Sequence, residues 1–202
     1  MKTNHRILNY GLSLLPAAAL LFTSCSTDSH VEKSSMTSIQ PGEPGGVAVE
    51  TYKETATVTA VDKATRKVTL VTKDGNKHTV KCGPQVANFN QIEVGDQVIA
   101  TVTEQLVVFV RKPGEPSGDG AVSAVALAPL GAKPGVLVAN TVEVTAKVKS
   151  IDVKNQKATL LFPDGTSKTI KVRKDVDLTK QNVGDDVVIR TTEAMAISVE
   201  KP

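Results

Sequence analysis

The chain has 202 residues, of which 40% are apolar and only 3% aromatic. Its 24 basic residues barely exceed its 21 acidic ones, and two of the basic residues, Lys2 and Arg6, lie at the very start of the chain. Nucleic-acid binding depends on a basic surface and, for single strands, on aromatic platforms on which bases stack, so this composition argues against a nucleic-acid partner.

Residues 1–24 have the three zones of a bacterial export signal. A basic start is followed by the apolar stretch GLSLLPAAALLF (11–22) and then by small or hydroxylated residues. The apolar stretch is shorter than the roughly 18 residues that span a bilayer. We therefore expect residues 1–24 to be a signal peptide that is removed on export.

The four residues Phe22-Thr23-Ser24-Cys25 resemble the lipobox of bacterial lipoproteins, in which Leu is usual at the position of Phe22. The resemblance implies that the Cys25 sulfur receives a diacylglycerol and that Cys25, acylated again on its amine, begins the mature protein. Several acyl chains on one residue give a stable membrane anchor. Ser26 resembles the sorting signal of outer-membrane lipoproteins, so we expect a protein of the bacterial cell envelope, lipid-anchored in the outer membrane and facing the periplasm. A secreted protein cleaved nearby is the alternative.

Beyond Cys25 the sequence repeats itself. Residues 58–82 match residues 148–172 at an offset of 90, and residues 94–113 match residues 183–202 at an offset of 89. Each copy holds an Asp-Gly pair, a Val-Gly-Asp triplet and a Thr-Glu pair at equivalent positions. A match over the whole unit indicates a duplication.

The duplication predicts two repeats separated by segments of different composition. The segment after Cys25 is rich in Ser, Thr, Pro and Gly and is expected to be a flexible tether, and the segment between the repeats is rich in Pro, Gly and Ala. Two stretches in these segments, PGEPGGVAV (41–49) and the apolar AVSAVALA (121–128), are candidates for a lead-in to the repeat and for an added strand. The expected parts are the signal (1–24), the tether (25–50), the first repeat (51–112), the linker (113–140) and the second repeat (141–202).

Each repeat is expected to hold five short strands. Residues 55–61, and their counterparts in the second repeat, alternate apolar and polar residues with the period of two that marks a half-buried strand. The Asp-Gly pairs predict hairpins between the second and third strands, because glycine accepts the positive φ of such turns. A connector with one helical turn follows, and the Val-Gly-Asp turn leads into the fourth strand (98–102 or 187–191) and the fifth (106–110 or 195–199).

Five antiparallel strands with a helical turn between the third and fourth predict an all-β fold of two tandem small barrels, OB-like or alternatively SH3-like. A unit of about 60 residues is marginal for an independent core, so the two repeats are expected to support each other. The pattern resembles a set of uncharacterised exported bacterial proteins that carry one or two such units, with the same Asp-Gly hairpin, Val-Gly-Asp turn and Thr-Glu-Ala last strand. These motifs specify turns, and the resemblance implies no activity and no cofactor.

Structural roles explain the titratable residues better than catalysis or metal binding does. His78 is replaced by Lys168 in the second repeat, which favours an exposed rim. It stands about 13 Å along a strand from Cys82, too far to share one metal ion. Cys82 matches Val172 and is expected in the core. The duplicated aspartates are expected to cap turns: Asp62, Asp74, Asp96, Asp152, Asp164 and Asp185. A calcium site is the alternative for the second-repeat set Asp175, Asp177, Asp185 and Asp186.

Glu104 and Glu193 recur between the expected fourth and fifth strands, and each follows a Thr. A turn that tolerates Thr-Glu explains them; if a functional surface is duplicated, these two side chains are the candidate interaction surface. We expect a non-catalytic binding or interaction module, not an enzyme, whose partner is an envelope protein or a cell-wall polymer. A periplasmic carrier of a small ligand or metal, and a hydrolase with a carboxylate site, are the alternatives.

Overall fold

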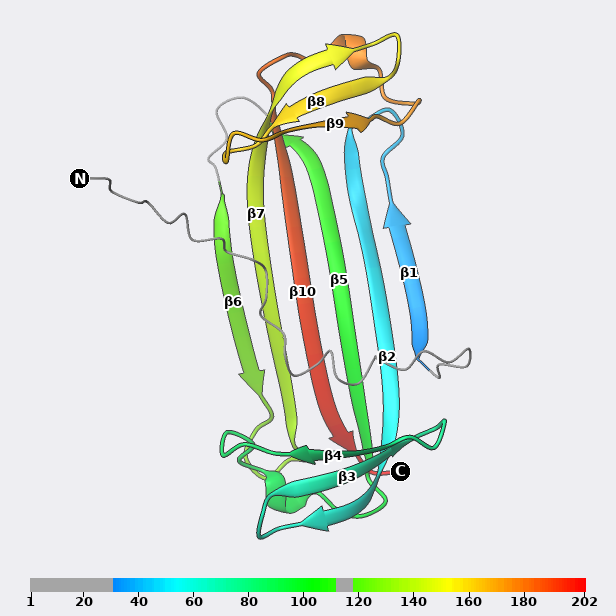
Figure 1. The fold of residues 1–202 in the computed structure, drawn as a ribbon, viewed down its shortest axis with the longest axis vertical. Coiled ribbons are helices and arrows are strands. Elements are labelled where there is room, and N and C mark those ends of the chain that lie inside the picture. Colours follow the sequence, from blue (N-terminus) through cyan, green and yellow to red (C-terminus); the bar gives the residue numbers. More distant parts are fainter. Residues whose placement is uncertain (1–30, 112–117) are drawn as a thin grey trace, which may run out of the picture.

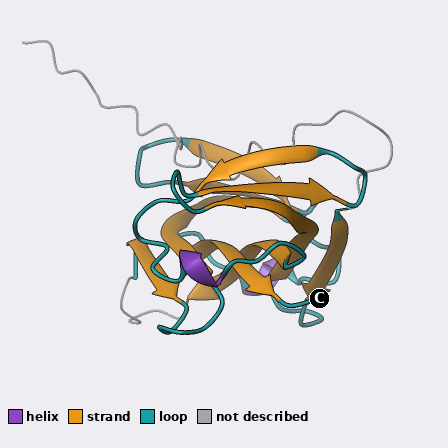
Figure 2. Ribbon diagram, turned by 90° about the horizontal axis from the view of Figure 1, so that it is seen from below, coloured by secondary structure: helices purple, strands orange, loops and turns teal. Residues whose placement is uncertain are grey.

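The computed structural model describes residues 31–111 and 118–202, so Cys25 lies outside the described residues. The described strands form one open antiparallel sheet of ten strands, and the helical segments among them are two 3-10 turns, η1 (Phe89–Gln91) and η2 (Leu178–Lys180). Figure 2 shows these two turns among the strands and loops. The strands are β1 (Glu32–Ser38), β2 (Gly45–Asp62), β3 (Lys67–Thr72), β4 (Lys77–Lys81), β5 (Gln97–Arg111), β6 (Gly120–Leu127), β7 (Gly135–Asp152), β8 (Lys157–Leu161), β9 (Ser167–Lys171) and β10 (Asp186–Glu200).

Six strands lie side by side along the long axis of the molecule, in the order β1-β2-β5-β10-β7-β6 (Figure 1). We call these six strands the long sheet. The all-β prediction is confirmed. The expected arrangement as two separate five-stranded barrels is not confirmed, because this single sheet runs through both repeats.

The prediction of separate fourth and fifth strands is wrong. Residues 97–111 form one continuous strand, β5, and residues 186–200 form another, β10. Thr103-Glu104-Gln105 contains neither Gly nor Pro, so nothing in its backbone requires a turn, and threonine favours extended structure. Pairing with strands on both sides then carries each strand across the whole molecule.

A small group of strands runs across each end of the long sheet (Figure 1). The first cap comprises the end of β2, with β3, β4 and the connector through η1. The second cap comprises the end of β7, with β8, β9 and the connector through η2. A register shift between Val58 and Ala60 redirects β2 into its cap, and one between Val148 and Ser150 redirects β7. Such bulges bend a strand and increase its local twist.

Each cap covers its own apolar core. The first core contains Val58, Phe89 and Ile92, with Phe89 only 1% exposed. Cys82 is half-buried and packs against this core, as its match to Val172 predicted, and burial raises the pKa of its thiol. The second core contains Ala146, Val148, Leu160 and Val187.

The segments expected to be tether and linker contain regular strands. β1 and the start of β2 form a hairpin within residues 32–50, and β6 and the start of β7 form the equivalent hairpin within residues 120–140. The lead-in at 41–49 is therefore part of the duplicated unit, and residues 120–127 are the added strand. The high proline and glycine content predicted a flexible tether and linker, and this prediction is wrong. These residues are concentrated in the turns of the two hairpins, whereas the flanking residues are extended and paired.

Candidate binding surface and apolar cavity

Both caps pack on the same face of the long sheet, which we call the inner face. Val58 of β2 is buried in the first core, and Val108 and Val110 of β5 pack against the second core. Successive side chains of a strand point to opposite faces. By that alternation, and by the continuous register between β2 and β5, Glu104 also lies on the inner face, midway between the caps.

A row of six polar residues crosses the middle of the inner face, and we call it the central row. Each member lies directly opposite the next in the strand register. The row is symmetric, because each half consists of the counterparts of the other half, so a pseudo-twofold axis passes between Glu104 and Glu193. From β1 to β6 its members are Ser35, Glu50, Glu104, Glu193, Asn140 and Ser123.

The structure therefore brings the two predicted interaction residues together. Glu104 and Glu193 face each other in mid-strand, not in two separate turns, and both are exposed. No hydrogen bond or ion pair joins either carboxylate to another residue in the described part of the chain. Directly opposite positions place Cβ atoms about 4.5–5.5 Å apart, and like charges at such positions are destabilising.

Glu50, on the other side of Glu104, has partners of its own. Its carboxylate accepts a hydrogen bond from the Tyr52 hydroxyl at 2.6 Å and pairs with Lys33 at 3.2 Å. These two contacts, the Tyr52 hydrogen bond first, lower the pKa of Glu50. Lys33 thus compensates the charge of Glu50, whereas no described residue does the same for Glu104 or Glu193.

Exposed apolar side chains flank the central row on the same face. Leu106 lies two residues from Glu104 on β5 and is 42% exposed, and Val142 of β7 is 38% exposed. Val125 and Leu127 of β6 extend this apolar surface to the edge of the sheet. An acidic centre surrounded by apolar side chains combines the two contact types found in protein–protein interfaces.

A second candidate site is an apolar cavity of about 310 Å³ beneath the second cap. Its walls are the cap itself, the C-terminal part of β5 and the turn between β1 and β2. Leu178 and Ala158 line this space and stand where the first repeat has Phe89 and Val68. Both changes replace a larger side chain by a smaller one.

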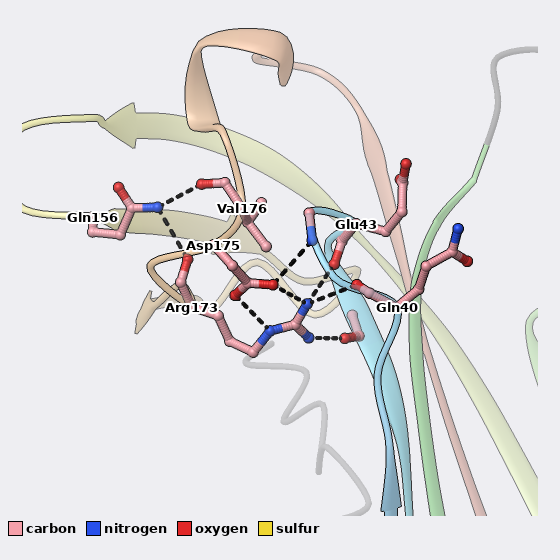
Figure 3. Close-up of polar contacts among 8 residues, drawn as sticks. Gln40, Glu43, Gln156, Arg173, Asp175 and Val176 are labelled. Carbon is pink, nitrogen blue, oxygen red and sulfur yellow. Dashed lines mark hydrogen bonds and ion pairs between the residues drawn. The ribbon is translucent and has the colours of Figure 1, made fainter.

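Arg173 closes one side of the cavity by binding the β1–β2 turn (Figure 3). Its guanidinium donates hydrogen bonds to the carbonyl oxygens of Gln40 (3.2 Å), Glu43 (2.7 Å) and Gly45. It also pairs with Asp175 at 3.1 Å, and Asp175 accepts a hydrogen bond from the Gly42 amide at 3.0 Å. The Arg173 hydrogen bond, with that of the Gly42 amide second, lowers the pKa of Asp175 to about 2.

The first cap, at the opposite end of the molecule, is likewise bound by a hairpin turn of the other repeat. Lys133, in the turn between β6 and β7, reaches the first cap and pairs with Asp96 at 2.6 Å. It also donates to the Gln91 carbonyl at 2.6 Å, and the Asn88 side chain donates to the Pro129 carbonyl at 2.8 Å. Each cap is therefore held by the hairpin turn of the other repeat, which confirms that the repeats support each other.

The remaining predicted residues have structural roles. The six predicted aspartates accept hydrogen bonds from backbone amides of their own turns, as predicted: Asp62, Asp74, Asp96, Asp152, Asp164 and Asp185. Of the calcium candidates, Asp175 pairs with Arg173, Asp177 caps η2 and Asp186 pairs with Lys147. No group of three His, Cys, Asp or Glu residues within 31–111 and 118–202 could hold a metal ion. His78, which we expected on an exposed rim, is instead half-buried on β4, opposite Leu70 of β3.

A buried ion network escaped the sequence analysis. The Glu143 carboxylate forms ion pairs with Arg111 at 3.2 Å and with Arg190 at 2.6 Å. Both Glu143 and Arg111 are more than nine-tenths buried. The duplication offered no signal for it, because the first repeat has Lys53 and Thr101 where the second has Glu143 and Arg190. The network joins β5, β10 and β7 on the face opposite the central row.

Comparison with known proteins gives no family for this chain, because no protein-family model and no curated protein matches it. Among the described residues there is no helix with the length and apolar character needed to cross a membrane.

Proposed function

We propose that the protein is a non-catalytic binding module of the bacterial cell envelope, held at the membrane by lipid on Cys25, and that it binds its partner through the inner face. The observation that carries this proposal is the pairing of Glu104 with Glu193. Two exposed carboxylates directly opposite each other lower the stability of the free protein. A cationic group bound between them would remove that cost.

The surroundings of the pair define the chemistry of the partner. Basic side chains would match Glu104 and Glu193, and apolar side chains would match Leu106 and Val142 beside them. An envelope protein supplies both kinds of group on one surface. A cell-wall polymer is the alternative partner, and it offers few apolar groups to cover the flanks.

The test is capture of envelope proteins by the membrane-anchored protein, with Glu104→Gln and Glu193→Gln alone and combined. Because the two carboxylates form one site, each single change should weaken capture and the double change should weaken it most. Higher ionic strength should weaken capture by the wild type, since salt screens exposed charges. Glu200→Gln, at the far end of β10, is the matched control and should bind normally. Unchanged capture by the double variant would remove the central pair from the binding surface.

A carrier of a small apolar ligand is the second candidate, and the cavity beneath the second cap favours it. Its volume of about 310 Å³ falls at the lower end of the range for ligand sites and equals about ten water molecules. Binding of the probe 1-anilinonaphthalene-8-sulfonate tests it. Leu178→Phe should reduce probe binding by filling the cavity, whereas equal binding by this variant and the wild type would exclude the cavity as the probe site.

A further inference from the structure

In the part of the chain that the structure describes, β6 is an unprotected edge of the long sheet. Among the described strands it pairs only with β7, and all eight of its residues are exposed. Val122 is 71% exposed, Val125 66% and Leu127 57%. Its register with β7 is continuous, so no bulge interrupts the strand, and the sequence GAVSAVAL contains no charge and no proline. Proteins normally protect a sheet edge with at least one of these features.

The opposite edge of the long sheet differs in this respect. β1 carries Glu32 and Lys33, and Lys33 pairs with Glu50 of the neighbouring strand. Charged side chains on an edge strand disfavour the addition of another strand. The two hairpins are equivalent by duplication, so the absence of charge from β6 is a difference that arose between the repeats.

The side chains of β6 fit a second copy of β6. In an antiparallel pair related by a twofold axis at Ala124, each large side chain lies opposite a small one. This register pairs Val122 with Ala126, Val125 with Ser123, and Leu127 with Ala121. An axis at Ser123 instead pairs Val122 with Ala124 and leaves Leu127 beyond the paired residues.

We propose that the protein forms a homodimer in which the β6 strands of two copies pair antiparallel around Ala124. The two long sheets then become one, and the unpaired backbone groups of both edges gain partners. The exposed apolar side chains of β6 gain neighbours at the same time. Within one chain, β5 and β10 already associate in this way, as duplicated strands paired antiparallel around a pseudo-twofold axis.

Disulfide trapping tests the register in the full-length chain, with Cys82→Val as background. Ala124→Cys places two thiols directly opposite each other, where Cα atoms about 4.5–5.5 Å apart suit a disulfide. In the Val122→Cys variant the two thiols lie about 14 Å apart, because residue 122 of one copy is four residues along the strand from residue 122 of the other. We expect rapid dimer cross-linking for Ala124→Cys and little for Val122→Cys. Equal cross-linking of both variants, or of neither, would overturn the proposal, as would a cross-link to a different protein.

Sedimentation equilibrium of the detergent-solubilised protein provides the second measurement. The wild type should have the mass of two chains after correction for detergent. Ala124→Lys should have the mass of one, because it places two ammonium groups together on the axis. The same change at the equivalent position of the other edge, Met36→Lys, is the matched control and should remain dimeric. A wild type with the mass of one chain at every concentration would also exclude the dimer.

Discussion

Arg66 and Gln156 occupy equivalent turns of the two repeats, and both adopt a positive φ, 55° and 53°. Each side chain fixes the connector of its own cap by donating to two equivalent carbonyl oxygens (Figure 3 shows Gln156). The hydrogen bonds run from Arg66 to Gly83 (2.9 Å) and Val86 (2.7 Å), and from Gln156 to Arg173 (3.1 Å) and Val176 (2.7 Å). Each repeat thus places a non-glycine residue in a costly backbone conformation, and in both places the side chain donates to two equivalent carbonyl oxygens of the connector.

Replacements at Gln156 should separate the cost of its positive φ from the contribution of its side-chain hydrogen bonds. Gln156→Ala loses both side-chain hydrogen bonds and keeps the left-handed conformation, so we expect it to lower the free energy of unfolding by about 1–3 kcal/mol. Gln156→Gly loses the same bonds but tolerates the positive φ. The glycine variant should therefore melt above the alanine variant in thermal unfolding. The reverse order would show that backbone strain at this turn is small.

Arg173 should control the closure of the second cap. Arg173→Ala removes the hydrogen bonds to three carbonyl oxygens of the β1–β2 turn. We expect faster hydrogen exchange at the Gly42 amide and a loss of about 1–3 kcal/mol in the free energy of unfolding. Lys174→Ala, at the next residue, is the control and should leave the exchange of Gly42 unchanged. Unaltered exchange in Arg173→Ala would mean that the turn is held by other contacts.

The pH dependence of stability should report on Asp175. Its pKa falls from the ordinary 3.8 to about 2 in the folded protein. A carboxyl whose pKa is depressed by folding stabilises the protein above its unfolded pKa and loses that contribution as pH falls through the folded pKa. The stability difference between wild type and Asp175→Asn should therefore be constant above pH 3.8 and shrink between pH 3.8 and about 2. A difference independent of pH over this range would contradict the assigned pKa.

Replacing Phe89 and Leu178 each by the residue of the other repeat should change the stability of the protein in opposite directions. Phe89→Leu removes volume from a side chain that is 1% exposed, and we expect it to cost about 1–3 kcal/mol of stability. Leu178→Phe adds volume next to the cavity, and filling a cavity commonly stabilises by about 0.5–2 kcal/mol. Denaturant unfolding of both variants checks this. A large loss of stability from Leu178→Phe would show that the cavity cannot accept the ring.

Cys82 should behave as a core side chain with a thiol of low reactivity. Burial raises its pKa, and the nearby Arg66 only partly opposes that effect. The thiolate is the reactive form, so alkylation of the folded protein by iodoacetamide at neutral pH should be slow. Cys82→Val, with the residue found in the second repeat, should change stability by less than about 1.5 kcal/mol. Alkylation as fast as that of the unfolded chain would place the thiol in solvent.

The local features of the fold were predictable because they depend on residues close in sequence. Gly75 and Gly165 have φ values of 85° and 83°, as the Asp-Gly hairpins required, and the aspartate caps lie within their own turns. From the sequence, Glu104 and Glu193 could be predicted only as two separate candidate interaction residues, and not as a pair. Its position depends on the register between β5 and β10, which joins segments 89 residues apart and leaves no local pattern.

The long-range features were missed for the same physical reason. The contact of Arg173 with the β1–β2 turn spans 128 to 133 residues, and composition at either end does not encode it. The proline and glycine of residues 41–46 are equally compatible with a free tether and with a docked turn. Only the packing of that turn against a cap distinguishes the two.

The crossed attachment of the turns determines the order in which the chain can fold. The first cap requires Lys133, which follows Asp96 by 37 residues, and the second cap requires a turn made more than a hundred residues before it. Neither end can be completed by the residues of its own repeat alone, so the closure entropy of long loops must be met before these contacts form. The two ends should therefore unfold in a single cooperative transition, although the sequence divides so evenly into halves.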